Sequence, residues 1–130
     1  METAKALIAD GKGLLAMDES DSTCNKRFEV PGIPQTVEAR RAYREMIVTT
    51  PKLSQSISGA ILYDDTIRQY MKGEFSVVKV LTNAGIIPGI KVDSGTLEMA
   101  GHSEEKITGG LDRLRGRLSE YYVLGARFAK

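Results

Sequence analysis

Four short apolar runs, separated from one another by helical patterns, constrain the fold of this chain more than any other feature. The first run, 14–17, is continuous and apolar, as expected of a strand buried on both faces of a parallel sheet. Three further runs lie at 57–63, 86–92 and 126–130. Because strands that alternate with helices favour parallel βαβ units with right-handed crossovers, the sequence predicts an α/β fold.

The helical patterns lie before and between these runs. One opens the chain over 2–9, and short helices are expected over 64–70 and 77–81. Thr36 is the expected N-cap of a longer helix, and its buried stripe is predicted to consist of Ala39, Tyr43, Met46 and Ile47. A second long helix ends at Gly125 and has four residues at helical spacing, namely Leu111, Leu114, Leu118 and Tyr121.

Two stretches show no period and are expected to be loops. The first, 18–35, contains Pro31, Gly32 and Pro34, and compact domains rarely keep a loop of that length without a function. The second, 93–108, includes the one histidine, His102, which is expected to be solvated.

The length of the chain bears on which α/β architecture to expect. An open sheet suits 130 residues, but the chain ends inside its fourth predicted strand with no helix to cover it. An eight-stranded βα barrel needs about 250 residues. We therefore expect residues 1–130 to form a single incomplete domain, the first half of a TIM (β/α) barrel that ends inside the fourth strand.

Charge and cysteine content exclude several classes of function. Lys and Arg number 18 against 17 Asp and Glu, so no strong field is present to hold nucleic acid or a membrane surface. Cys24 is the single cysteine, which excludes an intrachain disulfide and a cysteine zinc site and favours a reducing compartment. We expect Cys24 to be a packing thiol.

Polar residues at the ends of the predicted strands are the candidates for chemistry. Asp18, Lys91 and Lys130 each follow an apolar run. In βα folds, the positions at the carboxyl ends of the strands lie together at one edge of the sheet. An acid with two amines suits an anionic substrate and proton transfer. Spacing alone leaves the alternative that these are ordinary strand-end polar groups.

Several blocks of sequence together resemble one family in the same order along the chain. They are Gly11–Ser20, Thr23–Phe28, Arg40–Glu45, Thr49–Pro51, Ile57–Leu62, Gly85–Asp93 and Gly125–Lys130. They look like class I fructose-bisphosphate aldolase, and their residues are most similar to those of the bacterial or plastid branch of that family. By contrast, Gly11–Ala16 fits G-x-G-x-x-A but precedes a strand, so it does not indicate a dinucleotide site.

The resemblance implies a βα barrel and an enzyme of glycolysis and gluconeogenesis. The reaction is the reversible cleavage of fructose bisphosphate to dihydroxyacetone phosphate and glyceraldehyde phosphate, through a lysine imine (Schiff base) and without a metal or other cofactor. The family's imine lysine, together with its glutamate acid/base, lies on strands beyond Lys130. The 130-residue chain alone is therefore expected to be inactive.

The resemblance also implies roles for individual residues. Asp18 matches the aspartate beside the imine and Lys130 its electrostatic partner. Binding of the distal phosphate is implied for Lys91, Ser20 and Thr23, and Arg27 matches an arginine on the phosphate side of the cleft. Asp21 departs from the small or neutral residue that the family pattern has there, and an extra carboxylate would weaken phosphate affinity.

The expected partners follow from the same resemblance. They are a sugar phosphate and, in the complete protein, further copies of the chain; a half-barrel alone is expected to pair at its edges or aggregate. The expected location is the cytoplasm, or a plastid for a plant or algal source. Two alternatives stay open, a noncatalytic self-associating half-barrel and an open α/β binding module with Asp64 and Asp65 as acceptor acids.

Overall fold

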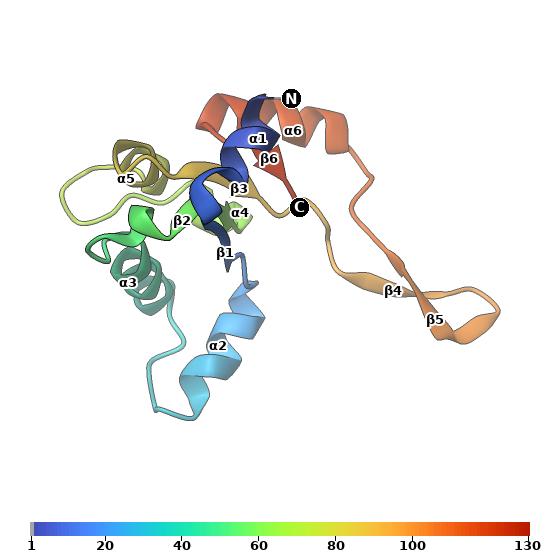
Figure 1. Ribbon diagram of the computed structural model, residues 1–130. Coiled ribbons are helices and arrows are strands. Elements are labelled where there is room, and N and C mark those ends of the chain that lie inside the picture. Colours follow the sequence, from blue (N-terminus) through green and yellow to red (C-terminus); the bar gives the residue numbers. More distant parts are fainter. Residues whose placement is uncertain (1) are drawn as a thin grey trace.

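A four-stranded parallel sheet lies at the centre of the computed structural model, which describes residues 2–130 (Figure 1). Its strands, in spatial order, are β1 (Gly13–Met17), β2 (Ile57–Leu62), β3 (Ile87–Ile90) and β6 (Phe128–Ala129). All three pairings are parallel, so the carboxyl ends of the four strands lie at one edge. The four apolar runs are thus confirmed as strands, and the α/β architecture agrees with the first half of a TIM barrel.

Five of the helices follow the sequence pattern. They are α1 (Glu2–Leu7), α3 (Val37–Val48), α4 (Asp64–Ile67), α5 (Val77–Asn83) and α6 (Leu114–Leu124). The hydroxyl of Thr36 caps α3 by accepting from Ala39 N at 3.1 Å, and Gly125 closes α6 with a φ of +112°. Single turns of 3₁₀ helix lie at Ala9–Gly11 and Leu53–Gln55.

The apolar core lies between the sheet and the helices that cover it. Leu62 and Ile90 from neighbouring strands pack with Val77 and Leu81 of α5 in one buried cluster. β1 was expected to be buried on both faces, but Leu14 is 48% exposed. Leu14 and Ala16 lie on the same face of β1 and are both exposed, so only the opposite face of this strand packs on the core.

The stretch 18–35 is not an irregular loop. It contains a nine-residue helix, α2 (Asp21–Glu29), whose N-cap is Ser20. Cys24 and Phe28, one turn apart, are its buried residues. Two apolar residues are too few to produce a visible period, because most of this helix faces charged groups and solvent.

The buried face of α3 also differs from the prediction. Met46 is 63% exposed, whereas the buried residues are Arg40, Arg44 and Val48. An apolar-stripe rule cannot find this face, because two of its three members are arginines that pair with acids outside α3.

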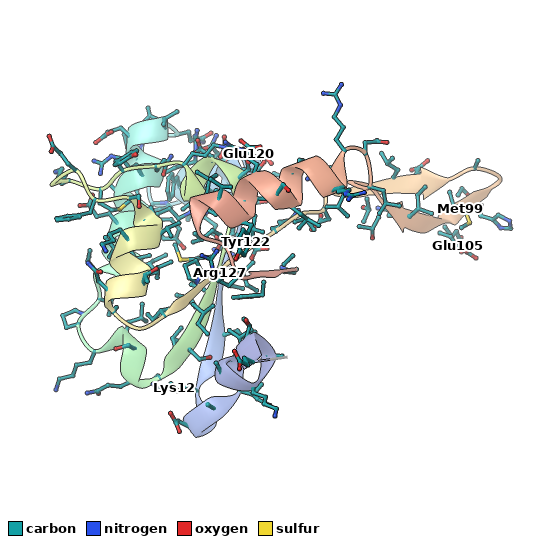
Figure 2. All side chains as sticks on the ribbon, turned by 90° about the horizontal axis from the view of Figure 1, so that it is seen from above. Lys12, Met99, Glu105, Glu120, Tyr122 and Arg127 are labelled. Atoms are coloured by element: carbon teal, nitrogen blue, oxygen red, sulfur yellow. The ribbon has the colours of Figure 1, made fainter. Side chains whose placement is uncertain are left out.

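The stretch 93–108 was expected to be a loop but forms an antiparallel hairpin. Its strands are β4 (Thr96–Met99) and β5 (His102–Thr108), and His102 is exposed at the start of β5. The hairpin extends away from the body of the molecule as a narrow arm, with Met99 and Glu105 on its outer part (Figure 2). All of β5 is exposed, so burial imposes no alternation on its sequence.

Only the C-terminal part of the predicted α6 stripe is buried. Tyr121 is 4% exposed, but Leu118 is 39% exposed and Leu111 lies before the helix and is 80% exposed. Among the helices of residues 2–130, none combines the length and the apolar character needed to cross a membrane.

The base of the hairpin depends on a glycine. Gly110 has a φ of +112°, and a Cβ there would lie 2.9 Å from both Ser94 N and Val92 O. These are main-chain atoms, which cannot rotate away. Arg117 donates to Val92 O at 2.9 Å and to Gly110 O, so it holds the same junction from α6.

We predict that Gly110→Ala lowers the free energy of unfolding by about 1–3 kcal/mol, because it adds a strained conformation and a main-chain clash. Gly116→Ala in α6 is the matched control: no atom lies within 4 Å of its added Cβ, and it should raise stability by about 0.4–1 kcal/mol. Urea unfolding of both variants tests this. Equal stabilities for the two would contradict it.

Candidate functional site

A cleft of about 510 Å³ opens at the carboxyl ends of the strands. Ten residues line it: Asp18, Glu19, Ser20, Thr23, Tyr63, Lys91, Asp93, Ser94, Gly95 and Lys130. Five of the six residues singled out from the sequence are in this set, the exception being Arg27. The three strand-end candidates, Asp18, Lys91 and Lys130, therefore share one cavity.

Asp18 and Lys130 form a direct ion pair across the cleft. Lys130 Nζ donates to Asp18 Oδ2 at 2.8 Å, and the Asp18 side chain is 8% exposed whereas that of Lys130 is 52% exposed. The hydrogen bond to Asp18 raises the pKa of Lys130, and the negative charges of Asp18, Asp93 and Glu19 add to this. The amine is therefore a protonated ammonium at neutral pH.

Lys91 is held in place by Asp93. Its Nζ donates to Asp93 Oδ1 at 2.6 Å and to Asp93 O at 3.0 Å, and Gly95 N donates to the same Oδ1 at 3.0 Å. The hydrogen bond from Lys91 lowers the pKa of Asp93, helped by the Gly95 N–H. The contact with Asp93 therefore holds the amine of Lys91 in place at the carboxyl end of β3.

Two hydroxyls lie where the cleft meets α2. Ser20 Oγ is 3.1 Å from Thr23 Oγ1 and accepts a long bond of 3.4 Å from Thr23 N as the helix cap. Hydroxyl donors beside the positive end of a helix suit an oxyanion. With Lys91, these hydroxyls can bind a phosphate group.

Arg27 lies outside the residues that line the cleft. Its guanidinium pairs with the Glu19 carboxylate and is 3.5 Å from the Tyr43 hydroxyl, and its side chain is 54% exposed. Asp21, the carboxylate that departs from the family pattern, pairs with Arg40 at 3.3 Å and does not line the cleft.

Sequence reasoning missed five lining residues: Glu19, Tyr63, Asp93, Ser94 and Gly95. The strand-exit rule applied to β2 would have found Tyr63, which follows that strand directly. Burial raises the pKa of the Tyr63 phenol, and Asp21, Asp64 and Asp65 raise it further. Tyr63 is therefore a neutral hydrogen-bond donor at neutral pH.

Asp64 and Asp65, the acceptor acids of the binding-module alternative, do not line the cleft. Asp64 Oδ1 accepts from Arg68 at 2.9 Å and from the Tyr121 hydroxyl at 2.8 Å, which ties α4 to α6. These contacts give Asp64 a structural role. The described residues, 2–130, contain no group of three or more His, Cys, Asp or Glu side chains placed to hold a metal ion.

The cleft combines the buried carboxylate of Asp18 with the amines of Lys91 and Lys130 and the hydroxyls of Ser20 and Thr23, and the carboxylates of Glu19 and Asp93 also line it. A carboxylate paired with an ammonium can take and return a proton while the cation stabilises developing negative charge. The second ammonium and the hydroxyls suit a phosphate. The site is thus fitted to acid–base chemistry on a phosphorylated substrate.

Comparison with known proteins gives a consistent result along the whole chain. A family model described as glycolytic fructose-bisphosphate aldolase class-I matches residues 1–130. A probable fructose-bisphosphate aldolase class 1 of Xanthomonas campestris is 60% identical over 129 residues, which are 99% of this chain and 39% of the relative. A chloroplastic fructose-bisphosphate aldolase 3 of Arabidopsis thaliana is 47% identical over 130 residues, which are 33% of its length.

A solved structure gives the same result for the fold. Fructose-bisphosphate aldolase from Plasmodium falciparum, in complex with TRAP and a small-molecule inhibitor, matches with a TM-score of 0.95 and 46% identity. The match covers 98% of this chain and 37% of that one. The chain thus spans between about a third and two fifths of the length of these relatives.

We predict an acid-sensitive contribution from the Lys91–Asp93 pair. Because the pKa of Asp93 is lowered in the folded state, the pair stabilises the fold above about pH 4, the reference range for Asp. That stability is lost as pH falls through the folded-state pKa. Asp93→Asn should therefore flatten the dependence of unfolding free energy on pH below about 4.

The control is Asp112→Asn, a change at an exposed carboxylate. Urea unfolding from about pH 6 to pH 2.5 should give the wild-type slope for this variant. An unchanged slope in Asp93→Asn would show that the pair adds nothing to acid stability.

Proposed function

Because the chain belongs to the class I fructose-bisphosphate aldolase family, we propose that it supplies part of the active site of a lyase that cleaves fructose bisphosphate. The products are dihydroxyacetone phosphate and glyceraldehyde phosphate, and the reaction is reversible. The observation that carries this proposal is the meeting of the Asp18–Lys130 pair with Lys91 and the Ser20 and Thr23 hydroxyls in one cleft.

Asp18 is the proposed acid–base group at the bond that breaks. Its carboxylate positions the substrate hydroxyl that becomes the aldehyde and helps to remove its proton. Lys130, 2.8 Å away and protonated, holds that carboxylate in place and stabilises the developing oxyanion. The small exposure of the Asp18 side chain strengthens both effects, since less water screens the charges.

The distal phosphate is proposed to bind at the other end of the cleft. Lys91 supplies the charge, and Ser20 and Thr23 supply hydroxyl donors at the start of α2. Arg27 lies one turn further along α2 and is half-exposed. We propose that its guanidinium leaves the Glu19 carboxylate and pairs with the phosphate oxygens when substrate binds.

The covalent step is assigned to a lysine outside these 130 residues. Each amine is held in an ion pair with an aspartate, Lys130 with Asp18 and Lys91 with Asp93, and an ion-paired ammonium has no free lone pair for attack on a carbonyl. We therefore propose that a polypeptide of these residues alone neither cleaves the substrate nor forms an imine.

Enzyme assays with the protein completed to the length of its relatives test this proposal. Triose phosphate release should follow addition of fructose bisphosphate, and borohydride should trap one substrate fragment on the protein. Asp18→Asn should lower kcat by about 10²–10⁴-fold, the range for loss of an acid–base group, with little effect on unfolding. Asp10→Asn, at an exposed surface site, is the control. Wild-type turnover in Asp18→Asn would remove Asp18 from the mechanism.

Lys91→Met should weaken binding of the phosphorylated substrate. Loss of a charged hydrogen bond of about 1.5–3 kcal/mol corresponds to a roughly 10- to 100-fold rise in KM. Lys79→Met, an exposed lysine on α5, should leave KM unchanged. An unaltered KM in Lys91→Met would exclude Lys91 from phosphate binding.

A further inference from the structure

Arg44 of α3 is a buried cation to which the proposed mechanism gives no role. The residue is 2% exposed, although a guanidinium is among the groups most costly to remove from water. It does not line the cleft and therefore cannot touch a substrate there. Its burial calls for an explanation from the groups around it.

The guanidinium of Arg44 holds the segment that joins β1 to α2. Nη1 donates to Glu19 Oε2, and Nη2 donates to Glu19 O at 2.8 Å and to Cys24 Sγ at 3.1 Å. It therefore fixes both the side chain and the carbonyl of Glu19, as well as the first turn of α2. Glu19 is the residue between Asp18 and Ser20.

The positive charge of Arg44 is compensated by the carboxylate of Glu19. Burial alone would raise the pKa of Glu19, but hydrogen bonds and the charges of Arg44 and Arg27 lower it overall. Glu19 is thus a carboxylate clamped between two guanidinium groups. A planar fork with several donors can bind two oxygens and a sulfur at once, which the single ammonium of a lysine cannot reproduce.

We propose that Arg44 is a positioning residue that sets the distance between Asp18 and the hydroxyls of Ser20 and Thr23. This inference rests on the proposed function, in which Asp18 acts at the bond that breaks and the hydroxyls bind the distal phosphate. Arg44 thereby fixes the span that a substrate must bridge. It is a determinant of preference for ketoses that carry a distal phosphate.

A ratio of rate constants separates this role from a merely structural one. The two substrates are fructose 1,6-bisphosphate and fructose 1-phosphate, which lacks the distal phosphate. A variant that only folds less well has less active enzyme, so kcat/KM falls equally for both substrates and their ratio is unchanged. A variant that misplaces the hydroxyls loses kcat/KM for the bisphosphate preferentially.

The experiment measures this ratio in the complete protein for Arg44→Met, Arg44→Lys and the control Val48→Ala. Val48 lies one turn further along α3, is 3% exposed and belongs to the apolar core, so its truncation destabilises α3 without removing a contact to Glu19. We expect the ratio of bisphosphate to monophosphate kcat/KM to fall about tenfold in Arg44→Met and less in Arg44→Lys. Val48→Ala should keep the wild-type ratio.

A ratio within about twofold of wild type in Arg44→Met overturns the proposal. If that variant does not fold, Arg44→Lys decides, and a wild-type ratio there overturns it equally. A ratio that falls as much in Val48→Ala as in Arg44→Met also overturns it. A wild-type protein that cleaves neither ketose contradicts the proposed function itself, and the inference about Arg44 falls with it.

Discussion

The ion pair between Asp18 and Lys130 joins the ends of the first and last strands of the sheet, and the site depends on this contact. Asp18 follows β1 and Lys130 follows β6, yet their side-chain atoms are 2.8 Å apart. In a flat sheet, three spacings of about 4.8 Å would place those strands roughly 14 Å apart. The long lysine side chain, together with the twist that sheets carry, spans this distance across the ends of β2 and β3. The row of polar groups at the carboxyl edge thereby surrounds a cavity.

The two sides of the site are supported by different forces. Behind β2 and β3, apolar residues such as Val77 and Leu81 pack against the strands, which fixes their ends without any directional contact. The segment from Asp18 through α2 lies outside that cluster: Phe28 packs edge-on against Tyr43 of α3, and the arginines of α3 hold the start of the segment. Hydrogen bonds from a guanidinium are directional. Under the proposed function, the hydroxyls of this segment lie at set distances from Asp18, and Arg44 meets that requirement better than a packed leucine.

Sequence reasoning succeeded where the fold buries apolar residues and failed where charged groups replace them. The four strands and the exit positions of Asp18, Lys91 and Lys130 followed from apolar runs, because parallel strands in this fold carry such runs. The helix α2 and the true inner face of α3 were missed, since their contacts are ion pairs between Arg40 or Arg44 and acids distant in sequence. The hairpin β4–β5 was missed because it buries too little to impose a pattern. Roles for individual site residues came from family resemblance alone.

The charges around the cleft show why an arginine layer is needed behind it. Three carboxylates line the cleft, those of Asp18, Glu19 and Asp93, against two ammonium groups, those of Lys91 and Lys130. The lining alone is therefore net negative and would repel a phosphate. Arg27 and Arg44 both pair with Glu19 from outside the lining, which reverses the sign of the site as a whole. An anion is attracted to the cleft because these arginines neutralise Glu19, and Arg44 contributes to this although it does not line the cleft.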